Sequence, residues 1–261
     1  MIVHNIEECK IAECVRRLEG YEVDNVSALR VRSFSAPVIE APAKGSVVGE
    51  GILSFTGNLS DQNREDVQHA FLFATLVANK KYPYEYQGKE WYYLFVQVLT
   101  DAGWLPTQKY YNDMNIGGNT VRMDQLVLEI LGGVIAGIAV PGSTSALMLK
   151  VAGDAITALK KRETALTLYE RNLLEHGVGG IAAGTCTEIN NEVTLALGTV
   201  RFIRKNTATQ VLFADWDSRE VKLYRGDSVF RKVPALVEQT RATILTKLGL
   251  NAKTKIDNYD I

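Results

Sequence analysis

Apolar side chains recur at helical spacing through the middle of the chain. Ser60-Asp61 is a typical helix start and Gly103 a typical helix end, while Thr120 and Ser143 precede two long apolar segments. The polar stretch 105–119 predicts a loop. The periodicity predicts helices over residues 60–79, 90–102, 120–140, 143–159 and 164–175.

The last third of the chain changes to a strand-like period. Short connections rich in turn residues favour an antiparallel meander of these strands. Pro234 then opens a final helix, which Gly249 closes. The predicted strands cover residues 178–186, 193–204, 210–216 and 220–224.

The first 59 residues combine both patterns. Residues 5–18 predict a short helix with Asn5 as its N-cap, and two strand-like runs follow at 28–34 and 47–55. The whole chain therefore predicts one α+β domain, in which a helix-rich first two-thirds packs on a C-terminal antiparallel meander closed by a final helix. Its three regions are residues 1–59, 60–176 and 177–261.

The helical hairpin of residues 124–160 allows two interpretations. Its apolar content suggests a membrane-inserting, pore-forming hairpin, or a buried central helix pair. Glu129, Lys150 and Asp154 interrupt it, and neither helix reaches the ~18 apolar residues that span a bilayer, so the buried pair is favoured. In that case Gly132, Gly133 and Gly137 would allow close contact between helices in the core.

Composition narrows the partners and the compartment. A net charge of -1 gives no global attraction to nucleic acid or anionic lipid. Cys9, Cys14 and Cys186 are too few for a disulfide framework and fit a reducing compartment. Residues 1–20 lack the pattern of a signal peptide. We therefore expect a cytoplasmic protein, with membrane association or export by a signal-less route left open.

Motifs of common catalytic or cofactor sites are missing from the sequence. His4, His69 and His176 are scattered without metal-ligand spacing, so no metal is expected. The sequence has no GxGxxG, GxxxxGK[ST] or GxSxG motif, so no cofactor site or catalytic residue is assigned. The tyrosine-rich segment 82–111 is interpreted as packing between helices with a polar-tipped rim.

Cys186 is the one residue that indicates chemistry. It follows the small run Ala182-Ala183-Gly184, which leaves room beside the thiol for something bulky. A cysteine thiolate is a good acyl acceptor when its pKa is lowered. Glu188 would instead raise this pKa, so the residues alone also allow a buried, inert cysteine.

Several short stretches resemble one bacterial family. These stretches are residues 72–81, 91–93, 102–104, 184–188 and 195–198. Over most of residues 60–261 they resemble the Erwinia virulence factor (Evf) family, whose members are signal-less α/β proteins linked to persistence in insect hosts. The resemblance implies a palmitoyl chain held as a thioester on Cys186, and a virulence or host-interaction factor acting at or near membranes.

Two alternatives remain beside this hypothesis. Cys186 could instead be the acyl carrier of an acyl-transfer enzyme, or the 124–160 hairpin could form a pore. Because a long chain left in water is very unfavourable, we expect the fatty acyl chain to lie in an apolar groove between the sheet and the helices.

Overall fold

The computed structural model describes residues 2–23, 45–57, 59–115, 120–175, 180–204, 212–217, 219 and 221–261. The helices are α1 (Ile2–Gly20), α2 (Asp61–Lys81), the 3-10 helix η2 (Glu85–Gln87), α3 (Gly88–Asp101), α4 (Met123–Ala136), α5 (Gly142–Leu159), α6 (Glu163–Glu175), α7 (Pro234–Leu248) and α8 (Asn251–Thr254). The strands are β1 (Gly45–Val48), β2 (Gly51–Phe55), β3 (Trp104–Met114), β4 (Thr120–Arg122), β5 (Gly180–Ile189), β6 (Glu192–Arg204), β7 (Asp215–Asp217), β8 (Val221–Lys232) and β9 (Ile256–Tyr259). The α+β prediction is confirmed.

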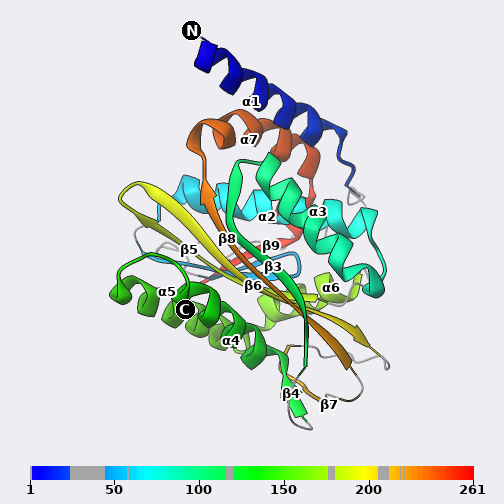
Figure 1. Ribbon diagram of the computed structural model, residues 1–261. Helices are drawn as coiled ribbons and strands as arrows, with labels where there is room; N and C mark the ends of the chain where they lie inside the picture. Colours follow the sequence, from blue (N-terminus) through cyan, green and yellow to red (C-terminus); the bar gives the residue numbers. More distant parts are fainter. Residues whose placement is uncertain are drawn as a thin grey trace.

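One seven-stranded sheet organises the molecule, in the order β3-β8-β6-β5-β2-β1-β9. All neighbouring pairs are antiparallel except β2 and β5, which run parallel. Figure 1 shows α1, α2, α3 and α7 on one side of this sheet and α4 and α5 on the other. Strands from all three regions of the sequence therefore join a single sheet.

Alternation along β6 explains why both faces of the sheet are covered. Leu195 and Leu197 belong to the core that includes α2, α3 and α7. Ala196, Val200 and Phe202 belong to the second core, which includes α4, α5 and α6. All five side chains are buried, so the strand carries apolar residues on both faces, as expected for a central strand.

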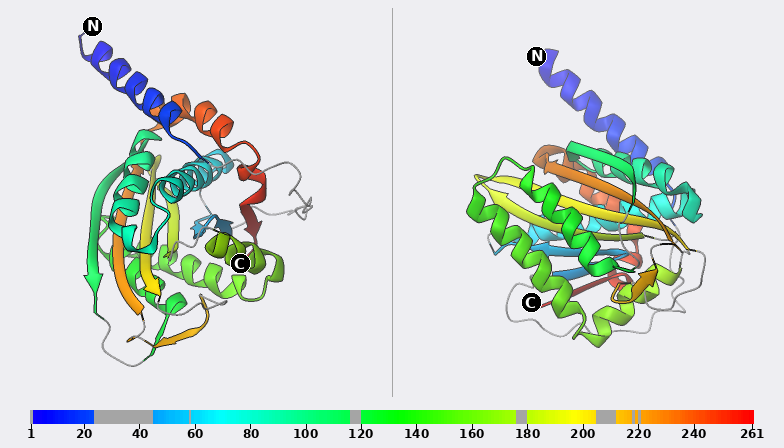
Figure 2. Two further views of the ribbon diagram at one scale, coloured as in Figure 1. Left: turned by 90° about the vertical axis from the view of Figure 1, so that its right-hand side faces the viewer. Right: turned by 60° about the horizontal axis from the view of Figure 1, so that its bottom comes forward.

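The 124–160 hairpin corresponds to α4 and α5, which lie side by side across one face of the sheet (Figure 2). Gly133 and Gly137 are exposed, so the expectation that they mediate close contact in the core is wrong. Gly132 is half-buried, and a Cβ atom there would make an ordinary contact of 3.6 Å with Leu149 of α5. Close approach occurs instead at Gly198 of β6, where a Cβ atom would lie 2.8 Å from the backbone nitrogen of Leu131. Helix α4 therefore rests on the sheet at this glycine.

Gly198→Ala is expected to lower the free energy of unfolding by about 1–3 kcal/mol, because a rigid helix backbone blocks the added methyl group. Chemical denaturation measures this change. Gly133→Ala is the matched control: its Cβ would meet only the end of the Arg225 side chain, at 3.4 Å. It should leave stability unchanged or raise it by up to about 1 kcal/mol. Equal stability of the two variants would contradict the packing described here.

Local signals predicted several boundaries correctly. Ser60 caps α2, accepting a hydrogen bond from the backbone N–H of Asn63, and Pro234 opens α7. Gly103 and Gly249 follow α3 and α7 with φ angles of 94° and 50°, which favour glycine. Asn5, by contrast, is not an N-cap, since α1 already begins at Ile2.

The predicted loop over 105–119 is wrong, because Trp104–Met114 forms β3. This strand lies at the edge of the sheet, where polar side chains remain in solvent and give no apolar alternation. Its register shifts between Pro106 and Gln108, as expected where proline interrupts an edge strand.

The predicted meander also needs correction. Strands β5, β6 and β8 are consecutive in the sheet, but β7 pairs with β4 in a separate two-stranded sheet. Thr120 begins β4 rather than a helix, and β9 was not predicted. Residues 47–55 form the β1–β2 hairpin, broken by a turn at Gly49 and Glu50. The predicted strand over 28–34 lies outside the described residues.

None of the helices within the described ranges combines the length and the hydropathy needed to cross a membrane.

Candidate functional site

Cys186 lies in the middle of the sheet on β5, with no measurable exposure to solvent. It is paired in register with Phe55 of β2 and with Leu195 of β6. All three side chains belong to the apolar core on the α2 side of the sheet. The thiol therefore faces the apolar layer between the sheet and the helices.

The first turns of α2 cover this part of the sheet. Asn63 Nδ2 donates a hydrogen bond of 2.9 Å to Oε2 of Glu188, two residues beyond Cys186 on the same face of β5. The guanidinium of Arg64 lies 5.4 Å from the ring centroid of Phe55. These two contacts place the start of α2 directly over the cysteine.

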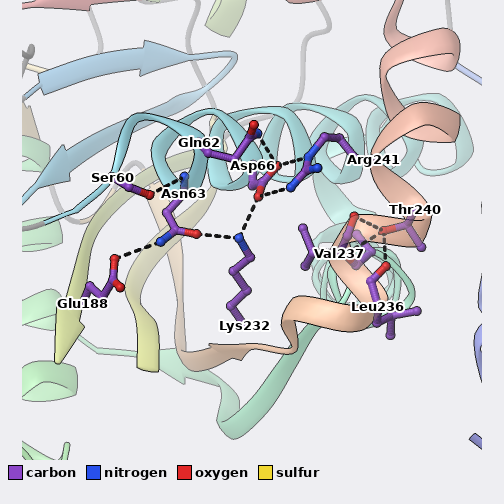
Figure 3. A network of polar contacts seen from close by, with 11 residues as sticks. Ser60, Gln62, Asn63, Asp66, Glu188, Lys232, Leu236, Val237, Thr240 and Arg241 are labelled. Atoms are coloured by element: carbon purple, nitrogen blue, oxygen red, sulfur yellow. Dashed lines mark hydrogen bonds and ion pairs between the residues drawn. The ribbon is translucent and has the colours of Figure 1, made fainter. Parts of the chain in front are cut away.

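A buried ionic network centred on Asp66 adjoins the cysteine and joins α2 to β8 and α7. Figure 3 shows Lys232 and Arg241 pointing toward the Asp66 carboxylate. Lys232 Nζ donates to Oδ2 at 2.7 Å, and Arg241 Nε donates to Oδ1 at 2.7 Å. Lys232 also donates to Asn63 Oδ1 at 2.5 Å. The Asp66 network thus fastens the cover over Cys186 to the sheet and to α7.

The electrostatics of the site keep the thiol neutral. Burial raises the pKa of Cys186 well above its ordinary value, Lys232 lowers it by less, and the carboxylate of Glu188 raises it further. The sequence-based expectation for Glu188 is confirmed in direction, although burial is the larger cause. In this closed arrangement Cys186 is a poor nucleophile, because the thiolate is the reactive form.

The space beside the thiol is filled by side chains. A Cβ atom at Gly184 would lie 2.9 Å from Cδ2 of Leu53 and 3.2 Å from the ends of Leu195 and Leu197. The expected room beside Cys186 is therefore not open, although its occupants are movable leucine ends rather than backbone.

A small pocket lies next to the Asp66 network. Its volume of about 10 Å³ holds one water molecule at most, whereas pockets for small molecules usually have ~300–1,000 Å³. It is lined by Asp66, His69, Ala70, Ala102, Trp104, Val237, Arg241 and Ile244. This pocket is too small to hold a fatty acyl chain.

The other residues singled out from the sequence lie elsewhere. Cys14 is a free, half-buried thiol that accepts a hydrogen bond from Arg17, and Cys186 is also free. The side chains of Cys9 and His4, and all of His176, lie outside the described residues. In the part of the chain that the structure describes, no three His, Cys, Asp or Glu side chains gather as a metal site would require.

Sequence reasoning missed Asp66, Lys232 and Arg241. Asp66 carried a detectable signal, since it precedes Val67 and lies four residues before Ala70 on the buried side of α2. A carboxylate on an apolar helical face requires a partner. The identity of that partner follows only from the tertiary fold.

Two solved structures resemble this chain at a distance. No protein-family model and no curated protein matches this chain. A solved structure of a delta-endotoxin aligns with a TM-score of 0.37 and 10% identity, covering 80% of this chain and 92% of that one. A structure of the Evf virulence factor aligns with a TM-score of 0.32 and 12% identity, covering 96% and 91%. The sequence resemblance to the Evf family is thus accompanied by a distant structural similarity. That similarity is too weak to indicate a function.

Proposed function

We propose that this protein carries a long-chain fatty acyl group, palmitoyl, as a thioester on Cys186 and acts as a virulence or host-interaction factor at or near membranes. The observation that supports the proposal is the complete burial of Cys186 in the apolar layer beneath α2. The chain lies in that layer while the protein is in solution and leaves it at a membrane.

Burial has opposite effects on the thiolate and on the thioester. It disfavours a charged sulfur, which is why the pKa of Cys186 is raised. A thioester is neutral, so the same apolar surroundings accept it and keep water away from its carbonyl carbon. Each buried methylene contributes a further ~0.8 kcal/mol. The site is therefore better suited to a stable acyl group than to a reactive thiol.

Loading requires the cover over Cys186 to open. The leucine ends beside Gly184 must move, and the contacts of Asn63 with Glu188 and Lys232 must break. The deprotonated thiol then attacks the carbonyl carbon of an acyl thioester donor. The donor's carbon–sulfur bond breaks, and its leaving thiolate takes up the proton. Closure of α2 follows, with the chain in the apolar layer.

The two alternative functions make different demands. An acyl-transfer enzyme needs a thiolate in every turnover, and the raised pKa of Cys186 works against that. Pore formation by residues 124–160 needs α4 and α5 to leave the sheet, where α4 buries seven residues and α5 six. Neither alternative is favoured by a specific contact of the site.

The intact mass of protein purified from a bacterial cytosol tests the proposal. We expect the wild-type protein and Cys14→Ser to carry the mass of a palmitoyl group, and Cys186→Ser to have the mass of the polypeptide alone. Neutral hydroxylamine, which cleaves thioesters, should remove the group and lower the melting temperature of the wild-type protein. After the same treatment, less of the protein should float with lipid vesicles.

Three outcomes would count against acylation at Cys186: a bare wild-type mass even after unfolding and refolding with palmitoyl-CoA, an added mass that resists hydroxylamine, or an added mass retained in Cys186→Ser. Continuous release of acyl groups to small thiols would favour the enzyme, and dye release from vesicles that survives Cys186→Ser would favour the hairpin.

A further inference from the structure

A second buried polar cluster lies on the same side of the sheet as Cys186, but far along it. Arg201 on β6 is six residues beyond Leu195, the residue paired with Cys186. That separation is roughly 20 Å along a strand. Around Arg201 lie Glu50 from the β1–β2 turn, Asn79 from α2 and Trp91 from α3.

Most polar groups of this cluster satisfy one another. Asn79 Nδ2 donates to Oε1 of Glu50 at 2.7 Å, and Trp91 Nε1 donates to Oδ1 of Asn79 at 2.5 Å. Arg201 Nη1 donates to Oε2 of Glu50 at 3.3 Å. The guanidinium carbon lies 3.8 Å from the centroid of the Trp91 ring. The plane of Arg201 is therefore held in place by a carboxylate and an indole.

Two donors of Arg201 remain without an acceptor. Its side chain is 3% exposed, and among the described groups neither Nε nor Nη2 has a hydrogen-bond partner. These two N–H groups lie on one edge of the guanidinium and point the same way. In proteins generally, this edge of an arginine can bind two oxygens of a carboxylate or phosphate in a bidentate manner. A buried and unsatisfied edge of this kind requires an explanation.

The glycines around Arg201 show that the guanidinium has a fixed place. A Cβ atom at Gly180 would collide with Nη1 and Cζ of Arg201, so the side chain lies directly across this glycine. Gly88 likewise leaves space for Tyr111, because a Cβ atom at Gly88 would lie only 2.7 Å from the Tyr111 hydroxyl oxygen. Two larger residues at these positions would push the guanidinium and the phenol out of place.

Charges of both signs act on this cluster. Glu50 is buried beside Arg201, and burial raises its pKa while the charges of Arg201 and Lys255 lower it by less. Glu85 is half-buried, and its carboxylate raises the pKa of Arg201, against the larger, lowering effect of burial.

We propose that the Nε/Nη2 edge of Arg201, which is closed to solvent in this structure, binds a small oxyanion, the carboxylate or phosphate group of a metabolite, when the side chains packed against that edge move aside. The oxyanion accepts both free N–H groups in the guanidinium plane, which the Trp91 ring and Glu50 hold in orientation. The site is separate from Cys186, and its occupancy does not depend on acylation.

Titration of the wild-type protein with sodium acetate and with sodium phosphate, at constant ionic strength set by chloride, tests this site. We expect one of the two anions to raise the melting temperature in a saturable way and to change the fluorescence of Trp91. A response to acetate assigns a carboxylate, and a response to phosphate assigns a phosphate. Arg201→Lys keeps the positive charge but loses the two-donor edge, so it should weaken binding by about tenfold or more.

Arg225→Lys is the matched control, because Arg225 is a half-exposed arginine held by Asp227 and should leave binding unchanged. If Arg201→Lys does not fold, the Nε–H resonance of Arg201 in the wild-type protein decides: it should shift saturably with the anion, while that of Arg225 does not. The proposal is overturned if neither anion gives a saturable response, if Arg201→Lys binds as well as wild type, or if a crystal structure at saturating anion shows only water on this edge.

Discussion

Replacement of Asp66 with alanine is expected to lower the free energy of unfolding by about 3–5 kcal/mol, as for loss of one partner of a buried ion pair. The side chain of Asp66 is 1% exposed and that of Lys232 is 7% exposed. Without the carboxylate, the Lys232 ammonium stays buried with only Asn63 as a described acceptor. Helix α7 also loses the ion pair between Arg241 and α2. Chemical denaturation followed by circular dichroism measures the loss.

Two further variants control this result. Asp66→Ala combined with Lys232→Met should recover part of the stability, because the uncompensated charge is removed. Asp154→Ala removes an ion pair with Lys150 in which both side chains are exposed, and should change stability by less than about 1 kcal/mol. If Asp66→Ala lowers the free energy of unfolding by no more than Asp154→Ala does, the Asp66 network does not stabilise the fold.

The Asp66 carboxylate should also make the free energy of unfolding depend on pH in the acid range. Burial alone would raise the pKa of Asp66, but the hydrogen bonds from Arg241 and Lys232 outweigh it, and the pKa lies below its usual range. An unfolded aspartate has a pKa of about 3.9, so it takes up its proton at a higher pH than the folded one. The stabilisation is present above that pH and is lost as pH falls through the lower, folded pKa. In Asp66→Ala, the free energy of unfolding should therefore change less with pH over this acid range than it does in the wild-type protein.

Local capping chemistry explains which elements could be predicted from the sequence. Ser60 begins α2, Pro234 begins α7 and Gly249 ends it, and each acts within one turn of its own helix. Strand β3 escaped prediction because its pairing with β8 depends on residues more than 100 positions away. Strand β9 is four residues long and pairs with β1, so its sequence carries little periodicity.

Glycine illustrates the same limit in one residue type. Gly133 and Gly198 carry the same absence of a side chain, but only Gly198 lies under a helix backbone. Which glycine mediates a close contact depends on where α4 crosses the sheet, and no local pattern encodes that position.

The candidate site divides in a similar way. Cys186 could be singled out from its small neighbours and its resemblance to a known family. The helix start that covers Cys186 could not be predicted, because Asp66 and Lys232, which hold it in place, are separated by 166 residues. Arg201 escaped notice for a related reason: a charged residue within a strand normally predicts an exposed position, and its burial depends on Glu50 and Trp91.

Glu50→Gln is expected to lower the free energy of unfolding by about 3–5 kcal/mol, because it removes the counter-ion of a buried guanidinium. The side chains of Glu50 and Arg201 are 4% and 3% exposed. Glutamine keeps the shape and can still accept from Asn79, but its amide NH2 group then faces Arg201, so the variant loses the charge and the acceptor for Nη1 together. Thermal and chemical unfolding of the variant give the magnitude.

A double-mutant cycle separates the pair from its surroundings. Glu50→Gln combined with Arg201→Met should be more stable than Glu50→Gln alone, since the uncompensated charge is gone and the methionine packs on Trp91. Added oxyanion should partly rescue Glu50→Gln, because a bound carboxylate or phosphate supplies the missing negative charge, and should not rescue the double variant. A Glu50→Gln protein as stable as wild type without added anion would show that Arg201 does not depend on this carboxylate.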